Sequence, residues 1–282
     1  MLIHGYNNDR AQAQESYDAV TQMLPDADRE AVWEFFWPGF IERITGASSD
    51  TPLSLAPHRD DRETESNQLI SALSYHLQVY KSREVGRALG HYLHGLRPDS
   101  LIFVAHSLGC RVALEAIRFM VSRETARRAA LSGACLMAAA VPTYMIDGSS
   151  SGRLGPLREA ATAIARSFVL YSTNDYVLRT AFRIGQTWAG EGFMPEAVGF
   201  NGGPETPWSA RGDTGLGHSG YWTHPSTAPA TLRAIGHAGP GSLRELPSFQ
   251  SVRWKLSPAV ELPARALNER NWRRVGRRNI LT

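Results

Sequence analysis

The chain is short of cysteine, of long apolar runs and of net charge. Its two cysteines, among 282 residues, are too few for a disulfide framework, and we expect both to be small buried hydrophobes in a reducing, cytoplasmic setting. No segment approaches the roughly 20 apolar residues of a membrane helix. The first residues, MLIHGYNNDRAQ, lack the basic region and apolar core of a signal peptide. The formal net charge of +3 is too small to predict a nucleic-acid partner.

What remains has the composition of a globular protein, with 43% hydrophobic and 20% charged residues and a mean hydropathy of −0.27. Apolar strand-like runs alternate with segments of helical period, which predicts an α/β fold with a mainly parallel sheet flanked by helices. The expected strands are 1–3, 31–37, 101–105, 134–140, 167–171 and 197–200. Helical spacing is clearest over 69–80, 85–96 and 108–120.

Three stretches interrupt this alternation: residues 44–60, residues 201–220 and the tail from residue 240 onward. Residues 44–60 and 201–220 are rich in glycine, proline and small polar residues, and each predicts a long loop. The acidic cluster at 60–65 is typical of a helix N-terminus. We therefore expect one domain over 1–237, with a candidate lid or insert at 40–80, and a proline- and arginine-rich extension at 238–282.

The most informative stretch is LIFVAHSLGC, residues 101–110. An apolar run leads into Ser107 and a helical pattern starts directly after it, which predicts a strand, a tight turn and a helix with the serine at the apex. The small residues Ala105 and Gly109 would let the strand and the helix approach closely. This is the arrangement of the G-x-S-x-G nucleophile elbow, with alanine in place of the first glycine. A buried turn serine is the alternative interpretation, which this context disfavours.

A serine nucleophile also needs hydrogen-bond donors for the oxyanion that forms when it attacks. His4-Gly5 follows the first apolar residues, and the glycine allows the backbone to turn sharply. We expect the backbone N–H groups of Tyr6 and of Leu108, the residue after the nucleophile, to form the oxyanion hole. By itself His4-Gly5 would predict only a turn, so this interpretation depends on the elbow.

The nucleophile further needs a base and a carboxylate that orients the base. Asp175 follows the strand pattern SFVLY, at the sheet edge where ligands bind in α/β proteins. It could instead cap the next helix, and Asp147 is the second candidate acid. His218, in the glycine-flanked GLGHSGYW, is the expected base, with His224 as the second candidate. The order Ser107, Asp175, His218 is the one expected for this elbow.

Together these motifs resemble the α/β-hydrolase superfamily, and within it a bacterial group with an HGYNN-type oxyanion segment and a closing GHS-aromatic motif. In this chain the two segments are residues 4–8 and 217–222, and the resemblance covers roughly residues 1–237. It implies a triad serine hydrolase that needs no metal or organic cofactor. The family normally has two or more strands before the His-Gly strand, whereas only residues 1–3 precede His4. We therefore expect a sheet without the first strands. The chain could be a fragment, have a wrongly assigned start or be a trimmed variant, and a frayed first segment would place Tyr6 loosely.

The expected reaction is cleavage of a carboxylic ester or related acyl substrate through an acyl-enzyme. Ser107 attacks the carbonyl, His218 takes the proton and Asp175 holds the imidazole. Two alternatives stay open: an acyltransferase that uses the same site, and a binding protein of the same fold without activity. A small acyl molecule is the expected partner, while the acyl chain length and the oligomeric state are not predicted.

Two further patterns predict no site. Residues 215–220, GLGHSG, satisfy the nucleotide-binding pattern G-x-G-x-x-G but follow a polar loop rather than a strand. His91 and His94 share one helix face, yet no third metal ligand accompanies them. We therefore expect neither a nucleotide nor a metal site.

Overall fold

The computed structural model describes residues 1–6, 8, 10–37, 61–123, 131–147, 155–225, 227–236 and 272–274. In this part of the chain the strands form a seven-stranded sheet in the order β6-β5-β4-β3-β1-β2-β7. Strands β1 to β6 are parallel, and β7 pairs antiparallel with β2 at one edge. The strands are β1 (Leu2–Ile3), β2 (Trp33–Phe35), β3 (Leu101–His106), β4 (Leu131–Met137), β5 (Ser167–Tyr171), β6 (Ala210–Asp213) and β7 (Trp272–Arg274).

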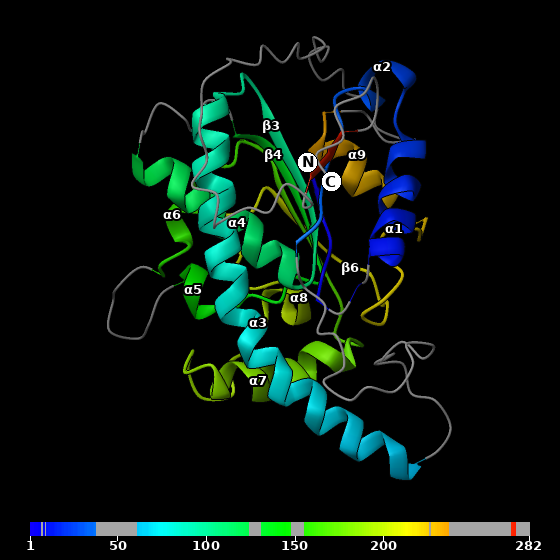
Figure 1. Ribbon diagram of the computed structural model, residues 1–282, viewed down its shortest axis with the longest axis vertical. Coiled ribbons are helices and arrows are strands. Elements are labelled where there is room, and N and C mark those ends of the chain that lie inside the picture. Colours follow the sequence, from blue (N-terminus) through cyan, green and yellow to red (C-terminus); the bar gives the residue numbers. More distant parts are fainter. Residues whose placement is uncertain are drawn as a thin grey trace.

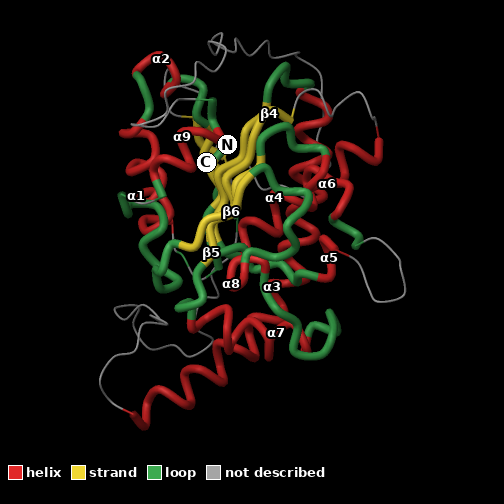
Figure 2. Tube along the Cα trace, turned by 180° about the vertical axis from the view of Figure 1, so that it is seen from behind, coloured by secondary structure: helices red, strands yellow, loops and turns green. Residues whose placement is uncertain are grey.

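Helices cover both faces of this sheet, as expected for an α/β protein. Helices α3 and α4 pack against each other on one face, whereas α1 and α9 lie on the other (Figure 1), and Figure 2 shows the same layers from behind. The helices are α1 (Arg10–Met23), α2 (Asp26–Arg29), α3 (Asp61–Leu96), α4 (Leu108–Arg123), α5 (Tyr144–Asp147), α6 (Arg158–Thr162), the π-helix η2 (Val177–Ala181), α7 (Phe182–Trp188), α8 (Val198–Asn201) and α9 (Ala228–Ala234). None of the described helices is long and apolar enough to cross a membrane.

Strand β3 and helix α4 form the centre of the core. Every residue of β3 except Ile102 is buried, which is typical of a parallel strand covered on both faces. Helix α4 is buried around its whole circumference over residues 108–117. The two cysteines, Cys110 and Cys135, are buried free thiols, as the sequence predicts. Burial raises the pKa of Cys135 to about 12, so this thiol stays protonated and chemically inert.

Helix α3 departs from the expected pattern. The two helical stretches at 69–80 and 85–96 belong to one helix of 36 residues, a length of about 54 Å at 1.5 Å per residue. It begins at Asp61, inside the acidic cluster that predicted a helix start. Leu77 and Tyr80, on its expected apolar face, are 55% and 48% exposed. The amino-terminal part of the helix extends past the body of the sheet (Figure 1). Next to Leu77 and Tyr80 the buried side chains are Tyr75, Gln78 and Val79, so at this level α3 packs through a different face from the expected one.

Other differences concern the later part of the chain. The strand expected at 197–200 is wrong, because α8 is a helical turn that ends at Gly202 with a φ of 82°. Strand β6 lies inside the loop expected at 201–220, and its sequence ARGD has no apolar alternation that could have revealed it. Strand β7 lies in the expected extension at 238–282 but joins the sheet. Of the candidate lid at 40–80, residues 40–60 are outside the described residues and 61–80 belong to α3.

Buried ion pairs hold the segment after β5 against helix α4. Arg111 of α4 donates from both terminal nitrogens to the two carboxylate oxygens of Glu191, at 3.1 and 3.2 Å. Its Nε donates to Glu115 one turn along the helix, at 3.0 Å. Glu191 follows α7, so these ion pairs hold the end of that helix on α4. Removing one partner of such a buried pair typically costs about 3–5 kcal/mol.

Candidate active site

The predicted motifs meet where the strand order of the sheet reverses. From β1 the chain first builds β2 on one side and then returns to build β3 on the other. The carboxyl ends of β1 and β3 carry residues 4–6 and Ser107, respectively. In open α/β sheets ligands bind outside the carboxyl ends of the strands at such a reversal point. The topology therefore makes this position the one where a ligand is expected to bind.

Ser107 forms a strained turn between β3 and α4. Its φ is +53°, in the left-handed region that a residue with a side chain occupies at a cost of about 1–3 kcal/mol. Three backbone bonds hold it there: its N–H donates to Met137 O at 2.9 Å, and its carbonyl accepts from Cys110 and Ala140, both at 3.1 Å. The turn that the sequence predicts is thus present and fixed by the end of β4.

The three predicted catalytic side chains form one chain of hydrogen bonds. His218 Nε2 lies 2.9 Å from Ser107 Oγ, and His218 Nδ1 lies 2.7 Å from Asp175 Oδ2. Ser107 is 4% exposed and Asp175 is fully buried, while the His218 side chain is 17% exposed. Because a substrate must reach the hydroxyl and the imidazole but not the carboxylate, this gradient of exposure suits a nucleophile, a base and an orienting acid.

The bonds of His218 also determine which nitrogen carries its proton. A carboxylate can only accept, so Nδ1 must donate to Asp175. In the neutral ring Nε2 is then bare, and it can accept the proton of the Ser107 hydroxyl. This is the tautomer that general-base catalysis requires.

Both carboxylate oxygens of Asp175 accept a hydrogen bond. Its Oδ2 accepts from His218, while its Oδ1 accepts from the backbone N–H of Leu178 at 2.9 Å. Its main-chain carbonyl accepts from Arg179 N at 3.0 Å. The sequence left open whether this residue caps a helix or orients the base. The structure has a contact of each kind: Oδ1 accepts from the backbone at the start of η2, and Oδ2 accepts from the His218 ring.

The loop that carries His218 turns at glycines on both sides. Gly215 and Gly220 have φ values of 66° and 92°, a conformation that suits glycine. Gly215 is tied down, because its N–H donates to Asp213 at 3.0 Å and its carbonyl accepts from Asn174 Nδ2 at 3.1 Å. After His218, the aromatic residues of the motif, Tyr221 and Trp222, are buried. These contacts at both ends explain how a loop residue reaches the sheet edge.

The expected oxyanion segment packs directly on the nucleophile. A Cβ on Gly5 would lie 2.8 Å from Ser107 Cβ, and a Cβ on Gly109 would lie 2.3 Å from His4 O. The close approach predicted at Gly109 is thus between α4 and the end of β1. Leu108 is the first residue of α4, so its N–H has no partner within the helix. Tyr6, the other expected donor, follows Gly5 at this contact.

His4 holds the backbone that leads to Tyr6. Its N–H donates to Tyr17 Oη at 2.7 Å, and this hydroxyl donates to Phe35 O, also at 2.7 Å. Trp37 donates its indole N–H to His4 O at 2.8 Å and its backbone N–H to His4 Nε2 at 3.2 Å. Burial lowers the pKa of His4 to about 4, so the ring accepts as a neutral imidazole. Tyr6 therefore follows a firmly held residue, and the first segment is not frayed at His4.

The second candidates lie apart from this hydrogen-bonded set. Asp147 ends α5 with its side chain 66% exposed and pairs with Arg158 at 3.6 Å. His224 is exposed in the turn before α9, and its backbone N–H donates to Gly220 O. The structure therefore brings together the first choice for each position and neither second choice.

Two further residues touch the site and are missed by the sequence analysis. His106, next to the nucleophile, bonds to the main chain of His218. Tyr75 of α3 lies edge-on to Tyr6, with ring centroids 5.6 Å apart, and packs against Phe182 of α7. His106 is part of the elbow motif and could have been singled out. Nothing in the pattern of α3 distinguishes Tyr75, since its contact depends on where α3 crosses the sheet edge.

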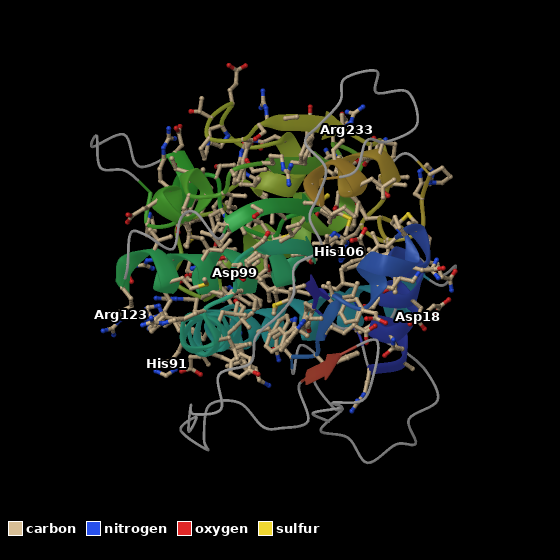
Figure 3. The ribbon with its side chains drawn as sticks, turned by 90° about the horizontal axis from the view of Figure 1, so that it is seen from above. Asp18, His91, Asp99, His106, Arg123 and Arg233 are labelled. Atoms are coloured by element: carbon tan, nitrogen blue, oxygen red, sulfur yellow. The ribbon has the colours of Figure 1, made fainter. Side chains whose placement is uncertain are left out.

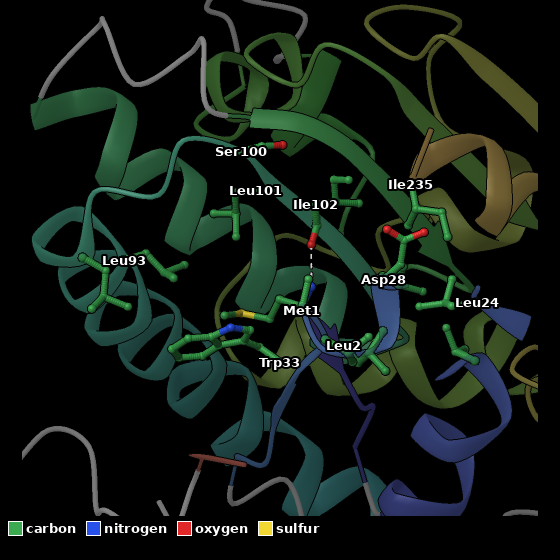
Figure 4. A pocket seen from close by; sticks show the side chains of 15 residues that line it. Met1, Leu2, Leu24, Asp28, Trp33, Leu93, Ser100, Leu101, Ile102 and Ile235 are labelled. Carbon is green, nitrogen blue, oxygen red and sulfur yellow. Dashed lines mark hydrogen bonds between the residues drawn. The ribbon is translucent and has the colours of Figure 1, made fainter. Parts of the chain in front are cut away.

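A separate apolar cavity lies at the opposite end of the sheet. Its volume is about 90 Å³, and Met1, Trp33, Leu93 and Ile102 are among the residues that line it (Figure 4). Ile102 is near the start of β3, whereas Ser107 follows its end. The cavity is therefore not part of the site around Ser107.

Among the described residues no group of three or more histidine, cysteine, aspartate or glutamate side chains could hold a metal ion. His91 packs against Phe119 instead, with ring centroids 5.8 Å apart.

Comparison with protein-family models, with curated proteins and with solved structures gives no significant match for this chain.

Proposed function

We propose that this protein is a serine hydrolase with an α/β-hydrolase fold that cleaves a carboxylic ester or a related acyl substrate. The observation that carries the proposal is the position of His218, whose two ring nitrogens lie 2.9 Å from Ser107 Oγ and 2.7 Å from Asp175 Oδ2. The strained turn at Ser107 and its place at the reversal of strand order support the same reading.

The geometry supports acyl transfer in two halves. Ser107 Oγ bonds to the substrate carbonyl carbon as its proton passes to His218 Nε2, and Asp175 stabilises the resulting imidazolium. The carbonyl oxygen becomes an oxyanion, for which the N–H groups of Tyr6 and Leu108 are the proposed donors. When the tetrahedral intermediate collapses, the bond to the alcohol breaks and His218 returns its proton to that alcohol. Water then repeats the sequence on the acyl-enzyme and releases the acid.

A fluorophosphonate probe together with short p-nitrophenyl esters tests the proposal. We expect the probe to label Ser107 in the folded protein, and Ser107→Ala to abolish both labelling and ester turnover. Hydrolysis in the presence of added alcohols would show whether an alcohol competes with water as acceptor, which separates a hydrolase from an acyltransferase. A folded protein that neither reacts with the probe nor turns over a broad ester panel would contradict the proposal and favour a binding protein.

A further inference from the structure

His106 connects the nucleophile with the loop that carries the base. It is the last residue of β3, and its ring is 7% exposed near the middle of the molecule (Figure 3). His106 Nε2 lies 2.9 Å from the main-chain carbonyl oxygen of His218. A carbonyl can only accept, so Nε2 must carry a proton and donate it. The peptide bond to Ser107 and this hydrogen bond thus link nucleophile and base through one residue.

The surroundings of the ring favour this single protonation state. His106 Nδ1 is buried and has no hydrogen-bond partner among the described residues. The ring packs among aromatic neighbours, with centroids 5.1 Å from His218, 5.7 Å from Tyr221 and 6.2 Å from Trp222. Burial lowers the pKa of His106 to about 3, which leaves the ring neutral over the ordinary pH range. A neutral ring with a bare Nδ1 is the form that donates from Nε2.

The bond lies where the loop has few other restraints. The loop is tied down at Gly215, three residues before the base, and turns again at Gly220, two residues after it. Between these points the bond from His106 acts on the main chain of His218 itself. The imidazole must reach Ser107 and Asp175 together, so a shift of this main chain would lengthen one of the two bonds or both.

We propose that His106 is a positioning residue, whose Nε2–H bond to the carbonyl of His218 places the base ring between Ser107 and Asp175. This inference rests on the proposed function in so far as the positioned ring is a catalytic base. His106 itself touches no reacting atom, and its effect is transmitted through His218.

Two variants separate the hydrogen bond from the shape of the side chain. In His106→Gln the amide nitrogen can take the place of Nε2 and donate to the same carbonyl. His106→Met has a similar length and no donor. For the methionine variant we expect kcat on p-nitrophenyl acetate to fall about 10- to 100-fold with little change in KM, because a displacement near 1 Å can cost about 10²-fold. The glutamine variant should recover most of this loss.

A spectroscopic readout makes the test independent of turnover. The proton on His218 Nδ1, bonded to Asp175, should give a low-field ¹H resonance that the wild type and the glutamine variant show and the methionine variant loses or broadens. Wild-type kcat and an unchanged resonance in His106→Met would overturn the proposal. So would a glutamine variant that folds but is as impaired as the methionine variant.

A further measurement needs no variant to fold. In the wild type, ¹⁵N spectra should show His106 protonated at Nε2 and bare at Nδ1, and the opposite tautomer would overturn the proposal. If the wild type neither reacts with fluorophosphonate nor cleaves esters, the proposed function fails. The tautomer and the His218 resonance would still decide whether His106 positions that ring.

Discussion

The amino and carboxyl ends of strands β1 and β3 differ in the side chains that surround them. At the amino end, β1 and β3 border an apolar cavity of about 90 Å³ lined by side chains such as Leu93 and Ile102 (Figure 4). At the carboxyl end, the same strands lead into a residue with positive φ, a close glycine contact and a chain of buried hydrogen bonds. Most buried polar groups in proteins have a hydrogen-bond partner, and Ser107, His218 and Asp175 are paired with one another.

Under the proposed function, the chemistry lies at the carboxyl end of the strands and away from the cavity. The cavity has few polar groups to orient a ligand, whereas the carboxyl end has a serine, an imidazole and a carboxylate within hydrogen-bond reach. Changes at the carboxyl end should therefore alter activity strongly, and changes at the amino end should alter stability alone. Four measurements test this difference, ordered from the largest expected effect.

The carboxylate of Asp175 should matter because it fixes the tautomer of His218. Asp175→Asn keeps an oxygen that can accept from Leu178 N but no longer fixes the His218 tautomer, so we expect kcat for ester hydrolysis to fall about 10⁴-fold with little loss of stability. Steady-state kinetics and thermal unfolding measure the two effects. The matched control is Asp147→Asn at an exposed ion pair, which should change neither. Equal activity of the two variants would show that Asp175 only caps the helix.

The contact between α4 and β1 should tolerate no added atom. In Gly109→Ala the new Cβ would meet the backbone oxygens of His4 and Ile3, at 2.3 and 2.7 Å. We expect a loss of about 1–3 kcal/mol in the free energy of unfolding, as in other overpacked cores. Displacement of the Tyr6 donor should also lower kcat, by up to about 10²-fold. Gly217→Ala, whose Cβ would meet nothing within 4 Å, is the control for stability. Similar unfolding midpoints for the two variants would contradict the proposed close packing.

The buried imidazole of His106 should make stability depend on pH. Burial lowers its pKa to about 3 from its ordinary value of 6.5, with His218, Asp175 and His4 as its titratable neighbours. Between these two values the unfolded chain binds a proton that the native state does not, so stability falls as the pH drops from 6.5 towards 3. His106→Gln should reduce this slope by up to one proton, as measured by urea unfolding at several pH values. His4, whose pKa burial lowers to about 4, should account for part of the slope that remains. An unchanged slope would show that His106 is not buried as described.

The smallest effect is expected at the amino end. Val20 lines the cavity and is 2% exposed, and Val20→Leu adds one methylene towards the empty space. We expect a change in unfolding free energy of less than about 1 kcal/mol, because filling a void offsets the strain of a larger side chain. Ester turnover should stay at the wild-type level. A substantial change in kcat would mean that the two ends of the sheet are coupled.

Much of the candidate site could be predicted because its parts are local in the sequence. The elbow is contained in residues 101–110, and the turn at Ser107 follows from a strand, small residues and a helix placed in succession. Asp175 and His218 could be selected only by order and by position after strand patterns. Strand β6 could not be predicted, since its exposed sequence ARGD joins the sheet through backbone pairing with β5. The segment 197–200 is predicted as a strand although residues 198–200 belong to helix α8, because a short apolar run has no clear period.

The amino-acid sequence predicts the class of fold and the turn at Ser107, because hydrophobic period and turn residues act over a few neighbours. For the acid and the base it leaves two candidates each, and the structure brings Asp175 and His218 to Ser107. Only the tertiary structure decided that β1 and β3 lie side by side, that His106 reaches the carbonyl of His218, and that Arg111 pairs with Glu191. These contacts join residues far apart in the chain. They depend on how whole elements pack, and no local pattern encodes that.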